Sequence, residues 1–397
     1  MWVEPSESGA RPLRLHALDA LRSVLMLLGV VLHAAYPYGQ SADWLVRDSH
    51  RSALMDGLID SIHFFRMPAF FVIAGCFSLM LLWRQGSAGG FLRERSRRIG
   101  VPLLATLLSF NLVQTWLLAG RPSLHSILLS AQVLGEEWTS GRVMGHLWFL
   151  VYLLVFCAGV AVLARPLARL SASRFPARLA GNRGFPLLLA VATGSGLGMV
   201  SIAYLAGPWF NHEYWGVLNP PELISYLPYF GIGLLLGMEE SLLLRFSSPG
   251  LGMGLLGLAS LAAMSLSAEG AGLLVKSVHV LATSLSTWAV LRFLFAAFRR
   301  WAGAPSRLFR YLSDASYSVY LMHHLFVVAL ATALLGLDWA PAWKFLLTCS
   351  LALGCCLAIH HFLVLRHPLL ALLFNGKRRR AATPIRPAPG DSTLASR

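Results

Sequence analysis

The sequence predicts an all-α polytopic membrane protein with about ten transmembrane helices, both termini cytoplasmic and no soluble domain. Its 397 residues are 56% hydrophobic and only 13% charged, and the mean hydropathy is +0.62. This composition is typical of a multi-pass membrane protein. The run at 223–238 is the shortest and contains Pro228. Apolar runs that approach spanning length lie at 15–37, 58–82, 101–119, 147–164, 186–206, 223–238, 250–268, 272–298, 312–335 and 342–365.

The distribution of basic residues predicts the orientation. If the N-terminus is cytoplasmic, alternate connections place 24 of the 33 Lys and Arg residues inside, 6 outside and 3 within spans. Positive charges concentrate on the cytoplasmic side of membrane proteins. The net charge of +15 is therefore interpreted as a sign of topology and of contact with the bilayer, and no nucleic-acid partner is expected.

The apolar runs and the basic residues together divide the chain into three segments. They are a cytoplasmic N-terminal segment at 1–14, a transmembrane domain at 15–376 and a basic tail at 377–397. The tail is basic and then rich in Pro, Ser and Ala, which is typical of a disordered segment held against anionic lipid. The five cysteines lie in apolar runs without metal-ligand spacing, so they are interpreted as packing residues.

The first apolar run contains three ionisable residues, Asp19, Arg22 and His33. Charged groups inside a membrane helix are costly and usually face the bundle interior. At about 100° per residue the three side chains share one helix face, and at about 1.5 Å per residue Arg22 lies some 16 Å along the axis from His33. An Asp–Arg pair is expected near one membrane surface and a titratable imidazole near the other. The alternative is an N-terminal anchor with a charged flank.

Further polar residues are expected near the outer ends of two other spans. His63 and Arg66 are three positions apart and share a helix face, while Gly75 in the same span allows another helix to approach closely. His146 and Trp148 begin the fourth run, and Trp148 also suits the aromatic belt of a membrane protein. Snorkelling of Arg66 to the interface remains an alternative.

Two more groups of residues are singled out. Arginines 93, 95, 97 and 98 precede the third run, where Pro102 is expected to start a helix, and guanidinium groups suit phosphates. Positive-inside topology alone also explains them. The ninth run places Ser316, Tyr320 and His323 on one face, although a serine often bonds its own helix. No metal site is expected, because no HExxH pattern or carboxylate partner accompanies the histidines.

Five stretches together resemble a known family. They are LDALRSVLMLLGVVLH (18–33), RMPAFFVIAGCFS (66–78), RRIGVP (97–102), GHLWFLVYLL (145–154) and SYSVYLMHH (316–324). In their order along the chain and in their residues they resemble the membrane acyltransferase 3 family, and most closely its subgroup that succinylates osmoregulated periplasmic glucans. The resemblance extends from about residue 14 to residue 376.

The resemblance implies a ten-helix enzyme of the bacterial inner membrane that moves an acyl group from cytosolic acyl-CoA to a sugar hydroxyl in the periplasm. It implies that His33 is catalytic with Arg22 as its paired arginine, and that Arg93 to Arg98 contact the donor. Succinyl-CoA or acetyl-CoA is the expected donor, with no tightly bound cofactor.

The chemistry of the residues agrees with this hypothesis. An imidazole titrates near neutral pH, so His33 suits the role of general base toward the acceptor hydroxyl. Asp19 would orient Arg22, and an interior channel would lead the donor toward His33. The acceptor or acyl pocket is expected to contain His63, Arg66, His146, Trp148, Ser316, Tyr320 and His323.

Other hypotheses remain open. An O-acetyltransferase for another glycan or a lipid would share every motif, and a transporter of an acyl or sugar compound would also contain intramembrane charges. Whether the acyl group visits an enzyme side chain, and whether the protein is a homo-oligomer, also remain open at this point.

Overall fold

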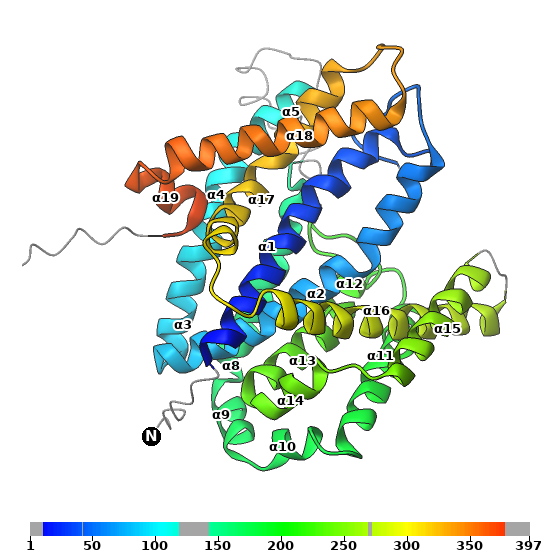
Figure 1. Ribbon diagram of the computed structural model, residues 1–397, viewed down its shortest axis with the longest axis vertical. Helices are drawn as coiled ribbons and strands as arrows, with labels where there is room; N and C mark the ends of the chain where they lie inside the picture. Colours follow the sequence, from blue (N-terminus) through cyan, green and yellow to red (C-terminus); the bar gives the residue numbers. More distant parts are fainter. Residues whose placement is uncertain (1–10, 42, 119–142, 269–271, 378–397) are drawn as a thin grey trace, which may run out of the picture.

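The computed structural model describes residues 11–41, 43–118, 143–268 and 272–377, and these ranges form an all-helical bundle (Figure 1). They contain no β-sheet, and one isolated antiparallel bridge joins Tyr214 to Leu218. Residues 1–10 of the expected N-terminal segment and residues 378–397 of the expected tail lie outside the described residues.

Long helices form the centre of the bundle. α1 packs mainly against α17 and α2, α2 packs most extensively against α13, and α18 packs against α17. In Figure 1, α1 runs diagonally through the molecule from the end where the N-terminus lies. The helices of 12 or more residues are α1 (Arg11–Ala35), α2 (Ala53–Gln85), α8 (Trp148–Val162), α11 (Gly184–Leu205), α13 (Leu227–Met238), α15 (Leu251–Ser267), α16 (Leu273–Trp301), α17 (Arg307–Ala333) and α18 (Pro341–Ile359).

Shorter helical segments connect or extend these. They are α3 (Ala88–Arg95), α4 (Val101–Thr106), α5 (Leu112–Leu118), α9 (Ala164–Ala172), α10 (Phe175–Leu179), α12 (Pro220–Ser225), α14 (Glu240–Phe246) and α19 (Pro368–Asn375). Short 3₁₀ turns lie at Tyr36–Tyr38 and Gly145–Leu147, and π-helical turns at Ser96–Gly100, Leu107–Asn111 and His360–Val364.

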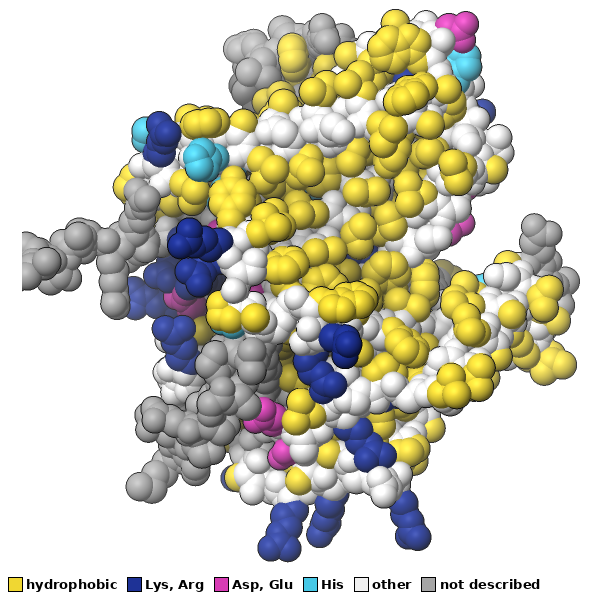
Figure 2. Space-filling view, in the orientation of Figure 1, with side chains coloured by type: hydrophobic (Ala, Val, Ile, Leu, Met, Phe, Trp, Pro, Cys, Tyr) yellow, Lys and Arg dark blue, Asp and Glu magenta, His cyan; other side chains and the backbone are white. Residues whose placement is uncertain are grey.

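Eight helices of the described residues are long and apolar enough to cross a membrane, or nine if the bent pair α14–α15 counts as one span. This confirms a polytopic helical membrane protein. The expected sixth span at 223–238 is not one continuous helix. It forms the two short helices α12 and α13, and neither is long enough to cross a membrane. The basic side chains gather along the left and lower edges of Figure 2, while hydrophobic side chains cover much of the remaining face.

The third span starts earlier than the sequence suggested. The chain is helical from Ala88 onward, because Ser87 caps it by accepting a hydrogen bond from the Gly90 amide at 3.1 Å. Pro102 is therefore inside a long helix, directly after the π-helical turn Ser96–Gly100. Arg97 and Arg98 lie in that turn, and π-helical turns frequently mark functional sites.

The glycine prediction for the second span is confirmed. A Cβ at Gly75 would lie 2.2 Å from the carbonyl oxygen of Phe230, and one at Gly233 would lie 2.1 Å from that of Val72. Only glycine permits the backbones of α2 and α13 to approach this closely. The crossing fixes α2, which positions His63 and Arg66.

Candidate active site

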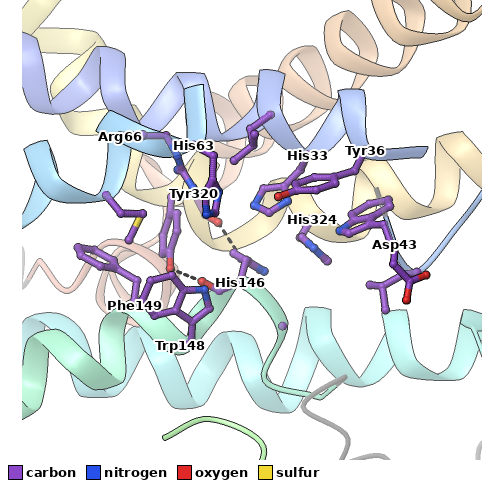
Figure 3. A pocket seen from close by; sticks show the side chains of 15 residues that line it. His33, Tyr36, Asp43, His63, Arg66, His146, Trp148, Phe149, Tyr320 and His324 are labelled. Carbon is purple, nitrogen blue, oxygen red and sulfur yellow. Dashed lines mark hydrogen bonds between the residues drawn. The ribbon is translucent and has the colours of Figure 1, made fainter. Parts of the chain in front are cut away.

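A cavity of about 320 Å³ lies where α1, α2, α8 and α17 converge with the connection that follows α1. We call it the histidine cavity (Figure 3). Its lining residues are Leu32, His33, Tyr36, Asp43, Trp44, Leu45, His63, Arg66, Met67, Gly145, His146, Trp148, Phe149, Tyr320 and His324.

Besides His63, four imidazoles are grouped around this cavity. The ring of His33 lies 4.9 Å from that of His324, 5.2 Å from that of His323 and 6.2 Å from that of His146, between ring centroids. The other three rings are buried, whereas His33 is partly exposed. Nδ1 of His33 has no hydrogen-bond partner among the described residues. His33 is therefore the imidazole of this group best placed to meet a substrate in the cavity.

The neighbours of His33 are held by hydrogen bonds. Tyr320 and His146 form a reciprocal pair, because the Tyr320 hydroxyl donates to the His146 carbonyl at 2.7 Å and Nε2 of His146 donates to the Tyr320 carbonyl at 2.9 Å. Nδ1 of His324 donates to Oε1 of Gln114 at 2.6 Å. In a neutral His324 this bond leaves Nε2 without a proton. These hydrogen bonds therefore fix the ring orientations of His146 and His324 and the tautomer of His324.

Arg66 contributes the positive charge of the cavity. It is only 7% exposed, and its Nε has no hydrogen-bond partner among the described residues. Among the described residues no ion pair joins Arg66 to a carboxylate, and Tyr36 and Tyr320 line the same cavity. A buried guanidinium is costly unless it is paired. An anionic group of a substrate would supply the missing partner.

Aromatic side chains border the cavity on two sides. Trp44 stacks on Tyr36 with ring centroids 5.8 Å apart, and it lies 6.3 Å from the ring of His33. On the side of α8, Trp148 stacks on Tyr226 at 5.8 Å. Flat aromatic faces next to an imidazole suit a ligand with apolar ring faces, such as a sugar.

A second cavity of about 190 Å³ lies farther toward the N-terminal end of α1. We call it the arginine cavity. Its charged or polar lining residues are Arg22, Arg95, Arg98, Ser313, Asp314, Asn375 and Lys377, with Tyr317 beside them. Because Arg22 and His33 are eleven residues apart on one helix, the two cavities follow each other along about 16 Å of α1.

The guanidinium groups of this cavity differ in their partners. Arg22 donates to Asp19 at 3.0 Å, as the sequence predicted, and to Ser313 at 2.7 Å. Arg98 is paired with Glu94. Arg95 donates to the Ser78 hydroxyl at 3.1 Å and lies over the Phe91 ring, while its Nε has no partner in the described ranges. The cavity is therefore rich in positive charge, and Arg95 is its least neutralised member.

One residue lines both cavities. Phe149 is 4% exposed and belongs to the wall of each. Its ring packs against Phe70 at 5.4 Å, against Phe71 at 5.2 Å and against Tyr320 at 6.2 Å, between centroids. The two cavities therefore share one aromatic residue in their walls, and the open interior channel that the sequence analysis expected stays a prediction.

Some predicted site residues lie outside the two cavities. Arg93 is exposed and lines neither, and Arg97 pairs with Glu94 without lining the arginine cavity. Ser316 is buried and donates to the Ser313 carbonyl of its own helix at 3.2 Å. His323 lies behind the lining, where its Nδ1 donates to the Tyr320 carbonyl at 2.8 Å.

The structure adds residues that the sequence analysis did not select. Tyr36, Asp43, Trp44, Phe149 and His324 line the histidine cavity. For His324 a signal was present, because it lies four positions after Tyr320 and therefore on the same helix face. Gln114 has no such signal, since it is 210 residues from His324 in the chain. In the described part of the chain, no group of three or more His, Cys, Asp or Glu residues is placed to hold a metal ion.

Comparisons with known proteins point the same way as this geometry. Residues 15–361 match the family model described as an acyltransferase domain, type 3. Glucans biosynthesis protein C of Escherichia coli K12 is 28% identical over 381 residues, which is 92% of this chain and 95% of that protein. The protein of the same name from Salmonella typhimurium LT2 is 28% identical over 378 residues, with the same coverage. No solved structure matches.

Proposed function

Because this chain belongs to the acyltransferase 3 family, we propose that it transfers a succinyl group from cytosolic acyl-CoA to hydroxyl groups of a periplasmic glucan at the bacterial inner membrane. The family supports a membrane acyltransferase, and the name of the relatives supports a glucan acceptor. The two cavities along α1, which share Phe149 in their walls, are the observation that supports the proposal most, since each suits one end of the reaction.

His33 is the proposed general base. The acceptor hydroxyl gives its proton to the imidazole while its oxygen attacks the thioester carbon. The new C–O bond forms, the C–S bond breaks, and the imidazolium returns the proton to the departing thiolate. The pantetheine arm reaches past Phe149 from the arginine cavity, where Arg22, Arg95 and Arg98 bind phosphate.

Arg66 is the proposed determinant of the acyl group. Succinyl differs from acetyl by a terminal carboxylate, and a buried guanidinium without a carboxylate partner suits that group. A site built to bind a polar group rejects an analogue that lacks it, because its own polar atoms then stay unpaired. Replacing Arg66 by methionine should therefore lower kcat/KM for succinyl-CoA by about tenfold or more and lower kcat/KM for acetyl-CoA much less.

The first test measures release of free CoA by purified protein given succinyl-CoA or acetyl-CoA and periplasmic glucan. Glucan-dependent release from succinyl-CoA that His33→Ala abolishes would support both the base and the donor. His361→Ala is the matched control, because His361 is exposed and lines neither cavity. Retained activity in His33→Ala would move the base to another histidine. An intact wild-type protein that uses neither donor would instead favour a transporter.

A further inference from the structure

The end of the described chain returns to the arginine cavity. Helix α19 packs against α4 and α17, and the two residues Asn375 and Lys377 form part of the cavity wall. Sequence analysis assigned Lys377 to a disordered tail, yet here it lies among the arginines that face the proposed donor.

The turn after α19 is fitted closely to the π-helical turn that contains Arg98. Gly376 has φ +62, and a Cβ at this position would lie 2.7 Å from Cα and 2.8 Å from the carbonyl oxygen of Arg98. The amide of Gly376 donates to the Leu372 carbonyl at 3.1 Å, which closes the helix. Glycine is required here both for the positive φ and for the close approach.

Helix α17 fixes this turn from the other side. The Asn375 side chain donates to the Asp314 carbonyl at 3.1 Å, and the Tyr317 hydroxyl donates to the Arg98 carbonyl at 3.1 Å. The Ser318 hydroxyl donates to the Phe374 carbonyl at 2.9 Å. The end of α19 with the turn after it, the π-helical turn and α17 are therefore held together around one cavity.

The charge of Lys377 is only partly neutralised. Its Nζ contacts Oδ1 of Asp314 at 2.5 Å, and 44% of its side chain is exposed. An ammonium group has three N–H donors, so two remain for another acceptor. Asp314 is the one carboxylate among the lining residues, which also include three arginines. Asp19 and Glu94 pair with Arg22 and Arg98, so the net positive charge comes mainly from Arg95, and the free donors of Lys377 add to it. This combination favours a ligand that carries phosphate.

We propose that the segment Asn375 to Lys377 completes the donor site and that Lys377 binds a phosphate group of CoA there. The identity of the donor rests on the proposed function, whereas the shape and charge of the wall do not. The C-terminal end of the membrane domain is on this view a binding element, and Gly376 sets the position of its lysine.

The test measures binding of CoA to the full-length protein by calorimetry in nanodiscs of zwitterionic lipid. Lys377→Gln should weaken binding about fivefold to tenfold, because one charge-assisted hydrogen bond is lost, and Lys377→Arg should retain it. Arg366→Gln is the matched control. It removes one exposed charge from the same end of the chain but does not line the cavity. Gly376→Ala, with Lys377 intact, should reproduce the loss.

A second arm distinguishes CoA from lipid headgroups, which also present phosphate. The same variants are compared in nanodiscs with phosphatidylglycerol. If Lys377→Gln changes only the dependence of activity on the anionic lipid, the segment contacts lipid and the proposal is wrong. If wild type binds CoA and Lys377→Gln binds it equally well, the proposal also fails while the proposed function stands. Absence of CoA binding by wild type overturns both.

Discussion

Arg66 lies against α1 at Gly29, one helical turn before His33. A Cβ at Gly29 would lie 2.7 Å from Nη1 of Arg66. The glycine therefore provides the space in which the guanidinium reaches the histidine cavity, and the position of the charge depends on a residue that has no side chain.

Gly29→Ala should displace the guanidinium without removing its charge. Since the clash involves the far end of a flexible side chain, the fold should persist while kcat/KM for succinyl-CoA falls by about tenfold. Steady-state kinetics with succinyl-CoA and acetyl-CoA measure the effect. Gly57→Ala is the control, because a Cβ there meets nothing within 4 Å. An unchanged preference between the two donors would argue against Arg66 as the acyl determinant.

The glycine crossing of α2 and α13 predicts a loss of stability. Gly233→Ala places a methyl group 2.1 Å from the Val72 carbonyl oxygen, so the helices must separate at a cost of about 2 kcal/mol or more. Thermal unfolding in detergent measures the loss. Gly231→Ala on the same helix should be neutral, because a Cβ there has open space. Equal melting temperatures for the two variants would contradict the close crossing.

A buried ion pair holds the connection that contains Trp44. Lys344 and Asp48 are both fully buried side chains with Nζ and Oδ2 2.7 Å apart. Lys344→Met leaves the Asp48 charge buried without its partner and should destabilise the protein by about 3–5 kcal/mol. Thermal inactivation measures this.

Restoring the charge balance should recover part of the stability. The double variant Asp48→Asn with Lys344→Met should be more stable than Lys344→Met alone, since no uncompensated charge remains. Lys276→Met is the matched control because Lys276 is exposed. A double variant that is less stable than Lys344→Met alone would contradict the expectation that the unpaired charge of Asp48 destabilises that variant.

The bond from His324 to Gln114 predicts an effect on turnover. Gln114→Leu removes the acceptor of Nδ1 and frees the His324 ring, so kcat should fall by about tenfold with little change in KM. Gln114→Glu keeps an acceptor oxygen and should retain more activity than the leucine variant. A rise in KM with unchanged kcat would instead indicate a role in substrate binding.

The membrane fold and much of the site were predictable from the sequence, because burial in lipid restricts polar residues so strongly. The pairing of Asp19 with Arg22 and their separation from His33 follow from helix geometry within one span. Gly75 likewise indicated a close helix contact before its partner was known.

What the sequence did not predict depends on contacts between distant segments. Gln114 meets His324 across 210 positions, and Lys377 meets Asp314 across 63. Arg97 was grouped with Arg98, but the π-helical turn directs only Arg98 into the arginine cavity. The short α13 looked like a span because its composition is apolar, while its burial comes from α2 and its neighbours.

Phe149 also bears on how a membrane that stores an ion gradient can contain such an enzyme. The proposed reaction would need a route for an acyl group through the bilayer, and a water-filled route would leak protons. The Phe149 ring, which belongs to the wall of both cavities, provides no hydrogen-bond partners for hydrated ions, whereas an acyl thioester would make apolar contact with it. Phe149, the residue between the proposed donor site and the proposed base, would then also prevent the ion gradient from dissipating through the enzyme.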